Sequence, residues 1–284
     1  MSYFKIILCV SMIFISSSFS REPVPPANLL QCGFEVTNYI HDKMTQLFGA
    51  FAELTASRYR NTRTIGVIFY VTSDNMTWNL AAVSRADIEA AMGRLNSHWS
   101  GLNIKFQICD TKLIEQTYHR TDFKESESAT EIEMGRRYHV SNLINVFIVQ
   151  TSRTSWANFP VVGNNDWILM NAAQFLNQSS FSHEMGHYFG LLHTHDSAFG
   201  HESMSGANCA VSGDLVCDTP ADPGLEALVD PTTCQPVKNL GFKPLTDNLM
   251  CYAPPSCRSK LSTGQRRQIM YFATRFRRSK RACR

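Results

Sequence analysis

The chain has 284 residues, of which 44% are hydrophobic and 18% are charged, an ordinary composition for a globular protein. Its formal net charge of +3 at pH 7 is too small to favour nucleic acid as a partner. Beyond the first 20 residues no apolar run approaches the length of a transmembrane helix, so we expect no membrane span.

The first 20 residues have the pattern of a secretory signal peptide. Lys5 precedes an apolar run at 6–15, and small residues at 18–20 surround a candidate cleavage point. The run is too short to span a bilayer. We therefore predict a secreted, extracellular protein, in which the sequons at Asn75 and Asn177 are candidate glycosylation sites.

Residues 21–62 are interpreted as a prosegment, because they are first rich in proline and then weakly helical at 34–54. The next elements alternate between strands and one helix. The predicted helix, 84–99, is amphipathic, and Ser84 with Asp87 matches a capping box at its start. The run at 146–149 is fully apolar, as a central strand should be. Four segments have strand patterns: 65–71, 103–108, 146–149 and 167–170.

The sequence HEMGHYFGLLH, at 183–193, has the spacing of a metal site. On a helix, His183 and His187 share one face, and Glu184 lies one step round from them. Gly190 can take the positive φ that ends a helix, so that His193 returns as a third ligand. Three imidazoles leave one zinc position open for water, whose proton Glu184 would accept during attack and deliver to the leaving group. The alternative is a helix whose histidines simply face solvent. A chance match is less favoured, because the full motif fixes residue types at five positions.

Beyond the third histidine the chain loses periodicity. His195 and His201 are interpreted as solvated loop residues. A last helix is predicted from Ser262, which forms a second capping box with Gln265. It carries an apolar stripe at Ile269, Phe272, Ala273 and Phe276. The basic residues that follow, 277–284, are expected to form a solvated tail.

Cysteine usage fits a secreted protein. One of nine cysteines, Cys9, leaves with the signal peptide, and an even number in a secreted chain favours disulfides. None has the CxxC spacing of a structural zinc site. Crosslinks are therefore expected to hold the loop-rich region at 209–257. The eight mature cysteines are Cys32, Cys109, Cys209, Cys217, Cys234, Cys251, Cys257 and Cys283.

The zinc motif and its neighbours resemble the pappalysin (cytophagalysin) family of the metzincins. The resemblance covers about residues 145–276 and implies an α/β (α+β) metzincin-type catalytic domain at 63–276. Its expected parts are a twisted mixed sheet, an active-site helix and a loop-rich, disulfide-bonded lower subdomain. The further matching segments are SWANFP at 155–160, GDLVCDTP at 213–220, NLMCY at 248–252 and TGQ at 263–265.

Residue by residue, the resemblance implies roles for most of this constellation. His183, His187 and His193 would bind zinc, and Glu184 would be the general base. Met250, in the family's Met-turn, would form an apolar floor under the metal, or it is ordinary core packing. Two residues on, the phenol of Tyr252 would donate to the oxyanion of the tetrahedral intermediate, or it is a buried structural tyrosine.

The resemblance also implies a second metal, calcium, and an inactive form in which a cysteine blocks the zinc. Family members bind calcium in the GDxVxDTP loop, so Asp214, Asp218 and Thr219 are calcium candidates, with an Asp-rich turn that satisfies its own backbone as the alternative. Cys32 resembles a cysteine switch, in which a prosegment thiolate occupies the open zinc position, or it joins a disulfide. If it is a switch, one cysteine is left over, for which Cys283 is the candidate.

Two departures from the family pattern concern the loops. Cys217 and Cys251 occupy the variable positions of the motifs at 213–220 and 248–252, respectively. We therefore predict a disulfide between these two cysteines. His195 stands where an aromatic residue usually follows His-Thr. The family's usual disulfide connectivity is therefore not assumed.

The expected activity is Glu-assisted attack of zinc-bound water on peptide bonds, by a secreted metalloendopeptidase that acts on proteins or peptides. Substrate is expected to add a strand to the sheet along an edge at 167–172. Two alternatives remain: a catalytically silent binding protein on the same scaffold, and a zinc hydrolase of non-peptide substrates. Loss of Glu184 or of a ligand would favour the silent protein, and none is lost.

Overall fold

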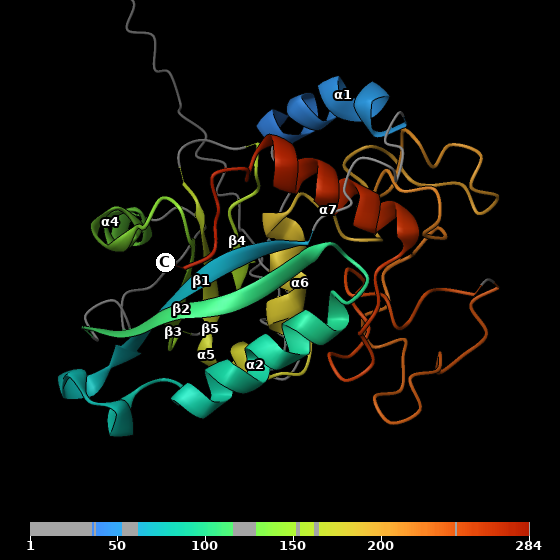
Figure 1. Cartoon of the computed structure of the whole chain (residues 1–284). Coiled ribbons are helices and arrows are strands. Elements are labelled where there is room, and N and C mark those ends of the chain that lie inside the picture. Colours follow the sequence, from blue (N-terminus) through green and yellow to red (C-terminus); the bar gives the residue numbers. More distant parts are fainter. Residues whose placement is uncertain are drawn as a thin grey trace, which may run out of the picture. The chain divides into compact units, whose positions relative to one another are not determined.

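A five-stranded sheet in the order β2-β1-β3-β5-β4 organises the described part of the chain (Figure 1). Four strands run parallel, and only β4 is antiparallel to its neighbour. Every residue of β3 and β5 is buried, as expected of parallel strands covered on both faces. The strands are β1 (Arg63–Ser73), β2 (Ile104–Glu115), β3 (Ile144–Val149), β4 (Trp156–Ala157) and β5 (Trp167–Asn171).

The computed structural model describes only part of the chain. The predicted signal peptide, Cys32 and most of the predicted prosegment lie outside the described residues. No helix among the described residues has the length and apolar character needed to cross a membrane. The described residues are 36, 38–52, 62–115, 129–151, 154–161, 165–241 and 243–283, all within the compact unit Gln31–Arg284.

Helices cover both faces of the sheet. One face of β1, represented by Val67 and Phe69, packs on α2 and α6, whereas Ile68 and Tyr70 face α4 through Met134. Figure 1 shows α4 apart from α2 and α6. The helices are α1 (Asn38–Ala52), α2 (Arg85–His98), α4 (Ala129–Tyr138), α5 (Ala172–Phe175), α6 (Ser180–Tyr188) and α7 (Thr263–Arg275), with short 3-10 turns at Asp74–Met76 and Trp78–Leu80.

Both predicted capping boxes are present. Ser84 accepts a hydrogen bond from the Asp87 amide at 3.2 Å, and the Asp87 carboxylate accepts one from the Ser84 amide at 2.9 Å. Ser262 and Gln265 do the same at the start of α7. These bonds satisfy amides that the first helical turn leaves without partners. The predicted helices at both places are confirmed.

The four predicted strands are confirmed, with β3 in the centre of the sheet. The edge assigned to 167–172 is wrong, because β5 pairs with β3 on one side and with β4 on the other. The strand at the edge is β4, where Trp156 pairs with Leu169 and Ala157 with Ile168. Two residues are too few to show the alternation by which a strand is recognised in sequence.

Helix α1 confirms the helical pattern predicted within 34–54. It lies beside α7 (Figure 1). Its buried Ile40 and Met44 share an apolar cluster with Phe272 of α7 and with Leu192 and Leu215. The cluster joins this helix to the segment that follows the zinc motif.

The C-terminal residues are not the solvated tail that their charge suggests. Lys280 is only 1% exposed and pairs with Asp166, which also accepts a bond from Arg277 at 2.6 Å. The Gly66 amide of β1 donates to the Arg281 carbonyl at 2.8 Å. A partly buried carboxylate from a loop distant in sequence therefore outweighs the tendency of a basic cluster to stay in water.

Three disulfides join the described cysteines, and the predicted Cys217–Cys251 bond is not among them. Cys217 instead pairs with the nearby Cys209, and Cys251 is a buried thiol. Cys283, the expected leftover, is bonded to β2. Motif positions alone do not place two sulfurs within bonding distance, which explains both errors. The bonds are Cys109–Cys283, Cys209–Cys217 and Cys234–Cys257.

Candidate metal centre

Helix α6 and the turn after it bring the three histidines together. The helix is buried along its whole length and carries His183, Glu184 and His187. Gly190 has φ +86°, as predicted, and the Leu191 amide donates back to a carbonyl of α6. A Cβ on Gly190 would also lie 2.3 Å from a ring carbon of Phe272. Only glycine meets both requirements, and the reversed chain then places His193 beside the helix.

The Nε2 atoms of the triad meet at one point. His187 Nε2 lies 3.2 Å from His183 Nε2 and 3.1 Å from His193 Nε2. His183 Nδ1 lies 2.6 Å from the Leu249 carbonyl and His187 Nδ1 lies 2.8 Å from the Leu191 carbonyl, so each Nδ1 donates its hydrogen there. The Nε2 atoms of these two rings are therefore lone-pair acceptors, as metal ligands must be.

Burial keeps these rings neutral. Desolvation lowers the pKa of His187 to about 3 and holds the pKa values of His183 and His193 well below the usual value. The acceptor Nε2 atoms of His183 and His187, 3.2 Å apart, repel one another unless a cation lies between them. Tetrahedral zinc with Zn–N bonds of about 2.0–2.1 Å requires N···N separations of about 3.3 Å. The geometry fits zinc, and the triad is the only such group of potential ligands found among the described residues.

The Met-turn lies directly beneath α6. Met250 is fully buried, and a Cβ on Gly186 would lie 2.4 Å from its sulfur, so the glycine makes room for the thioether. Leu249 holds His183 through its carbonyl, and the Thr194 amide donates to the Met250 carbonyl at 3.2 Å. Met250 thus packs in the core and lies in a turn that orients ligands, so the two interpretations of it coincide.

Two sequence motifs meet behind this turn. Asn248 Oδ1 accepts a bond from the Met250 amide at 2.8 Å, and the side-chain amides of Asn248 and Gln265 bond to each other at 2.9 and 3.1 Å. All three residues are buried. The pair connects the start of α7 to the Met-turn and gives a physical reason for both motifs.

The other two expected catalytic side chains lie beside the triad. Glu184 is 2% exposed and follows His183 on α6. Tyr252 is half-buried, with its ring centroid 4.6 Å from that of His193 and 6.3 Å from that of His183. The structure therefore brings together the triad, Glu184 and Tyr252.

Arg258 is a residue of this site that the sequence did not reveal. It is 8% exposed, its Nη1 donates to the Cys251 carbonyl at 3.1 Å, and the same atom lies 3.2 Å from His183 Nδ1. After burial and the charge on His187, the charge on Arg258 is a further cause that lowers the pKa of His183. A lone arginine in a loop rich in serine and proline carries no sequence signal of burial.

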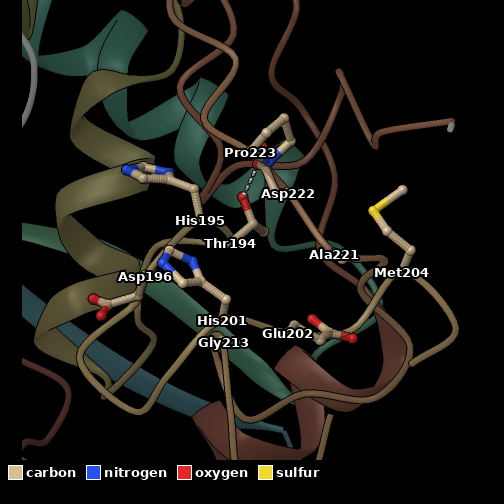
Figure 2. Close-up of a pocket in the computed structure, with 10 residues that line it drawn as sticks. All are labelled: Thr194, His195, Asp196, His201, Glu202, Met204, Gly213, Ala221, Asp222 and Pro223. Atoms are coloured by element: carbon tan, nitrogen blue, oxygen red, sulfur yellow. Dashed lines mark hydrogen bonds between the residues drawn. The ribbon is translucent and has the colours of Figure 1, made fainter. Parts of the chain in front are cut away.

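A cavity of about 200 Å³ lies next to the third histidine (Figure 2). His201 is exposed at its wall, in agreement with the prediction for that residue. His195 is half-buried and stacks on His193 with centroids 5.0 Å apart, so its interpretation as a solvated residue is wrong. The lining residues are Thr194, His195, Asp196, His201, Glu202, Met204, Gly213, Ala221, Asp222 and Pro223.

The calcium candidates bond mainly to their own chain. Asp214 is buried and accepts bonds from the Thr219 hydroxyl at 2.9 and 3.0 Å. Burial raises the pKa of Asp214 well above its usual value. Asp218 instead accepts bonds from the Ser262 hydroxyl at 2.6 Å and the Gly264 amide at 2.8 Å, which caps α7. These contacts favour the alternative in which the loop satisfies its own polar groups, and calcium stays a prediction.

Comparison with known proteins agrees with this centre. The peptidase M43 family, described as pregnancy-associated plasma protein-A, matches residues 141–272, which contain β3, β4, β5, α6, the Met-turn and most of α7. Residues 141–272 carry a pappalysin metallopeptidase domain.

Curated relatives of this chain are fungal proteins named extracellular metalloprotease. The protein of Arthroderma benhamiae is 22% identical over 255 residues, which are 82% of this chain and 81% of that protein. The protein of Neurospora crassa is 23% identical over 271 residues, which are 87% of this chain and 88% of that protein. The similarity therefore extends over 81% and 88% of the two relatives.

Solved structures share the metzincin-type fold. Mature mirolysin of Tannerella forsythia, in complex with a cleaved peptide, has a TM-score of 0.54 and 18% identity to this chain. The match covers 77% of this chain and 95% of the mirolysin chain. A promirolysin mutant from the same organism has a TM-score of 0.57 and 18% identity to this chain. That match covers 87% of this chain and 96% of the promirolysin chain. The pro form thus shares more of this chain's fold than the mature form does.

Proposed function

We propose that this protein is a secreted zinc endopeptidase. The observation that carries the proposal is the convergence of three buried Nε2 atoms, with 3.1 and 3.2 Å between them, next to Glu184. The predicted signal peptide and the extracellular relatives support secretion. Intact ligands and an intact Glu184 disfavour a silent binding protein.

The roles of the side chains follow from their positions. Zinc held by His183, His187 and His193 would polarise the scissile carbonyl and make a water acidic. Glu184 accepts the proton of the attacking water and returns it to the leaving amine, so no covalent acyl-enzyme is needed. The phenol of Tyr252 donates to the oxyanion that forms on the carbonyl oxygen. The Met-turn fixes the ring of His183 during this cycle.

Substrate lies along β4 in this proposal. That strand is the sheet edge on the α6 side, and it contacts α6. A peptide adds to such an edge by backbone hydrogen bonds, which bind any sequence in an extended form. The substrate class is therefore proteins or peptides, with side-chain preference set by the loops after His193 and Tyr252.

The decisive experiment is metal removal from the purified, processed protein. We expect a strong chelator to abolish cleavage of a denatured protein substrate and stoichiometric zinc to restore it, because the triad has no catalytic role without a cation. Cleavage is followed by gel electrophoresis and metal content by atomic emission. Cleavage that persists in metal-free protein would exclude the proposal.

We also propose that Cys32 is a cysteine switch. Among the described residues, six cysteines are paired with one another and the seventh, Cys251, is a buried thiol, so none of these seven offers an exposed thiol. A soft thiolate is a good fourth ligand for zinc. The match to the solved pro form, which covers 87% of this chain against 77% for the mature form, supports the presence of a prosegment.

For this switch we expect Cys32→Ser to make the unprocessed chain active, because a hydroxyl is a far weaker zinc ligand than a thiolate. Activity on a fluorogenic peptide should rise at least about tenfold over the latent wild type. Cys251→Ser is the matched control, since its thiol is buried in an apolar cluster with Leu225 and Val229 and its replacement should leave latency intact. Equal latency of wild type and Cys32→Ser would contradict the switch.

A further inference from the structure

Two hydrogen bonds hold the residue that precedes His195. The Thr194 amide donates to the Met250 carbonyl at 3.2 Å. The Thr194 hydroxyl donates to Asp222 at 2.5 Å, the bond drawn in Figure 2. The backbone of His195 is therefore fixed relative to the Met-turn, so its ring has few positions to choose from.

The ring of His195 contacts the third ligand and the tyrosine together. Its centroid lies 5.0 Å from that of His193, with the planes inclined by 20°, and 4.2 Å from that of Tyr252, inclined by 52°. His193 and Tyr252 are themselves 4.6 Å apart. The three rings form one mutually packed group, in which the contact between His195 and Tyr252 is the closest.

This packing matters because Tyr252 is only half-buried. The ring of a partly solvated tyrosine can rotate, so fixing its hydroxyl next to a reacting oxygen costs conformational entropy. The ring of His195 occupies space into which the ring of Tyr252 would otherwise turn. A side chain that limits this rotation lowers the cost of placing the hydroxyl.

We propose that His195 is a positioning residue that holds the ring of Tyr252 against the third metal ligand. The inference rests on the proposed function, in which the Tyr252 hydroxyl donates to the oxyanion. His195 acts through its shape as a flat ring, so another flat ring should replace it and a small side chain should not.

Kinetics of the zinc-loaded, processed enzyme test the inference. His195→Ala should lower kcat about tenfold with KM changed less than about twofold, because Tyr252 acts on the transition state more than on bound substrate. His195→Phe should restore kcat to within about twofold of wild type. In the Tyr252→Phe background, His195→Ala should cost less than about twofold, since the hydroxyl it positions is already gone.

The matched control is His201→Ala. His201 lines the same cavity but is exposed, and we expect its replacement to leave kcat and KM unchanged. An unchanged kcat in His195→Ala would overturn the proposal. So would an equal loss in the presence and absence of the Tyr252 hydroxyl, because His195 would then act by another route.

A readout that needs no activity separates this inference from the proposed function. Nitration of Tyr252 by tetranitromethane, located by mass spectrometry, should be several-fold faster in His195→Ala than in wild type or His195→Phe. This difference reports the freedom of the phenol whether or not the protein cleaves peptides. Equal nitration rates in the three proteins would overturn the positioning role, whereas failure of zinc to restore cleavage would overturn only the proposed function.

Discussion

Glu184→Gln should lower kcat/KM on a peptide substrate by about a thousandfold while the protein keeps its zinc. Glutamine has the size of glutamate but accepts no proton at neutral pH, so the attacking water and the leaving amine lose their proton carrier. The three histidines are untouched, and the carbonyls of Leu249 and Leu191, which hold the rings of His183 and His187, stay in place. The measurement is steady-state kinetics beside zinc determination on the same preparation.

The matched control is Glu133→Gln, on the exposed face of α4. It makes the same chemical change away from the centre and should keep wild-type kinetics. A Glu184→Gln protein with more than about a tenth of wild-type kcat/KM would remove Glu184 from the role of general base. Loss of zinc from this variant would instead make Glu184 a structural support of the site.

Asp166→Ala should reduce the free energy of unfolding by about 3 kcal/mol. The carboxylate of Asp166 pairs with Arg277 and Lys280 and accepts a bond from the Tyr188 hydroxyl at 2.5 Å. Both cationic side chains are buried, so removal of Asp166 leaves two positive charges without their counterion. Urea unfolding followed by tryptophan fluorescence at pH 7 measures the loss.

The same effect has a defined pH dependence. Burial alone would raise the pKa of Asp166, but His139, Arg277 and Lys280 together hold it well below its usual value. A carboxyl whose folded-state pKa is depressed stabilises the protein above its unfolded-state pKa, about 4, and loses that contribution as pH falls further. The difference between wild type and Asp166→Ala should therefore be complete near pH 7 and shrink steadily below about pH 4.

Asp247→Ala is the control for this series. It breaks an ion pair with Lys260 that has a short distance, 2.8 Å, but lies exposed to solvent. Exposed pairs contribute little, so its unfolding midpoint should stay close to that of wild type. Equal destabilisation by the two substitutions, or a loss in Asp166→Ala that does not depend on pH, would contradict the stabilising role of the buried cluster.

Features set by neighbouring residues could be predicted from sequence. The capping boxes at Ser84 and Ser262 need only residues three positions apart, and both are present. The pairing of His183 with His187 follows from helix geometry alone. Gly190 was recognised because a helix that must end and return needs a positive φ.

Features that depend on residues distant in the sequence could not be predicted. Cys209 and Cys283 have partners chosen by the fold, and no local pattern distinguishes them from Cys251. Lys280 looks solvated until Asp166 is known to face it. Arg258 has the same difficulty, because its burial depends on how the loop after the Met-turn folds over α6. Each of these contacts joins segments whose meeting is a property of the tertiary structure.

The bonds made by the last residues affect how the protein folds during its synthesis. Chains leave the ribosome from the N-terminus, so β1 and β2 emerge long before residues 277–283 exist. Until then Gly66 lacks the carbonyl of Arg281, and Cys109 lacks a partner 174 positions later in the chain. Arg277, whose Nε lies 3.3 Å from a carbonyl of the active-site helix, also arrives last. All five strands are therefore made before the residues that crosslink β2, bond to β1 and contact α6, and the fold gains these three contacts only at the end of synthesis.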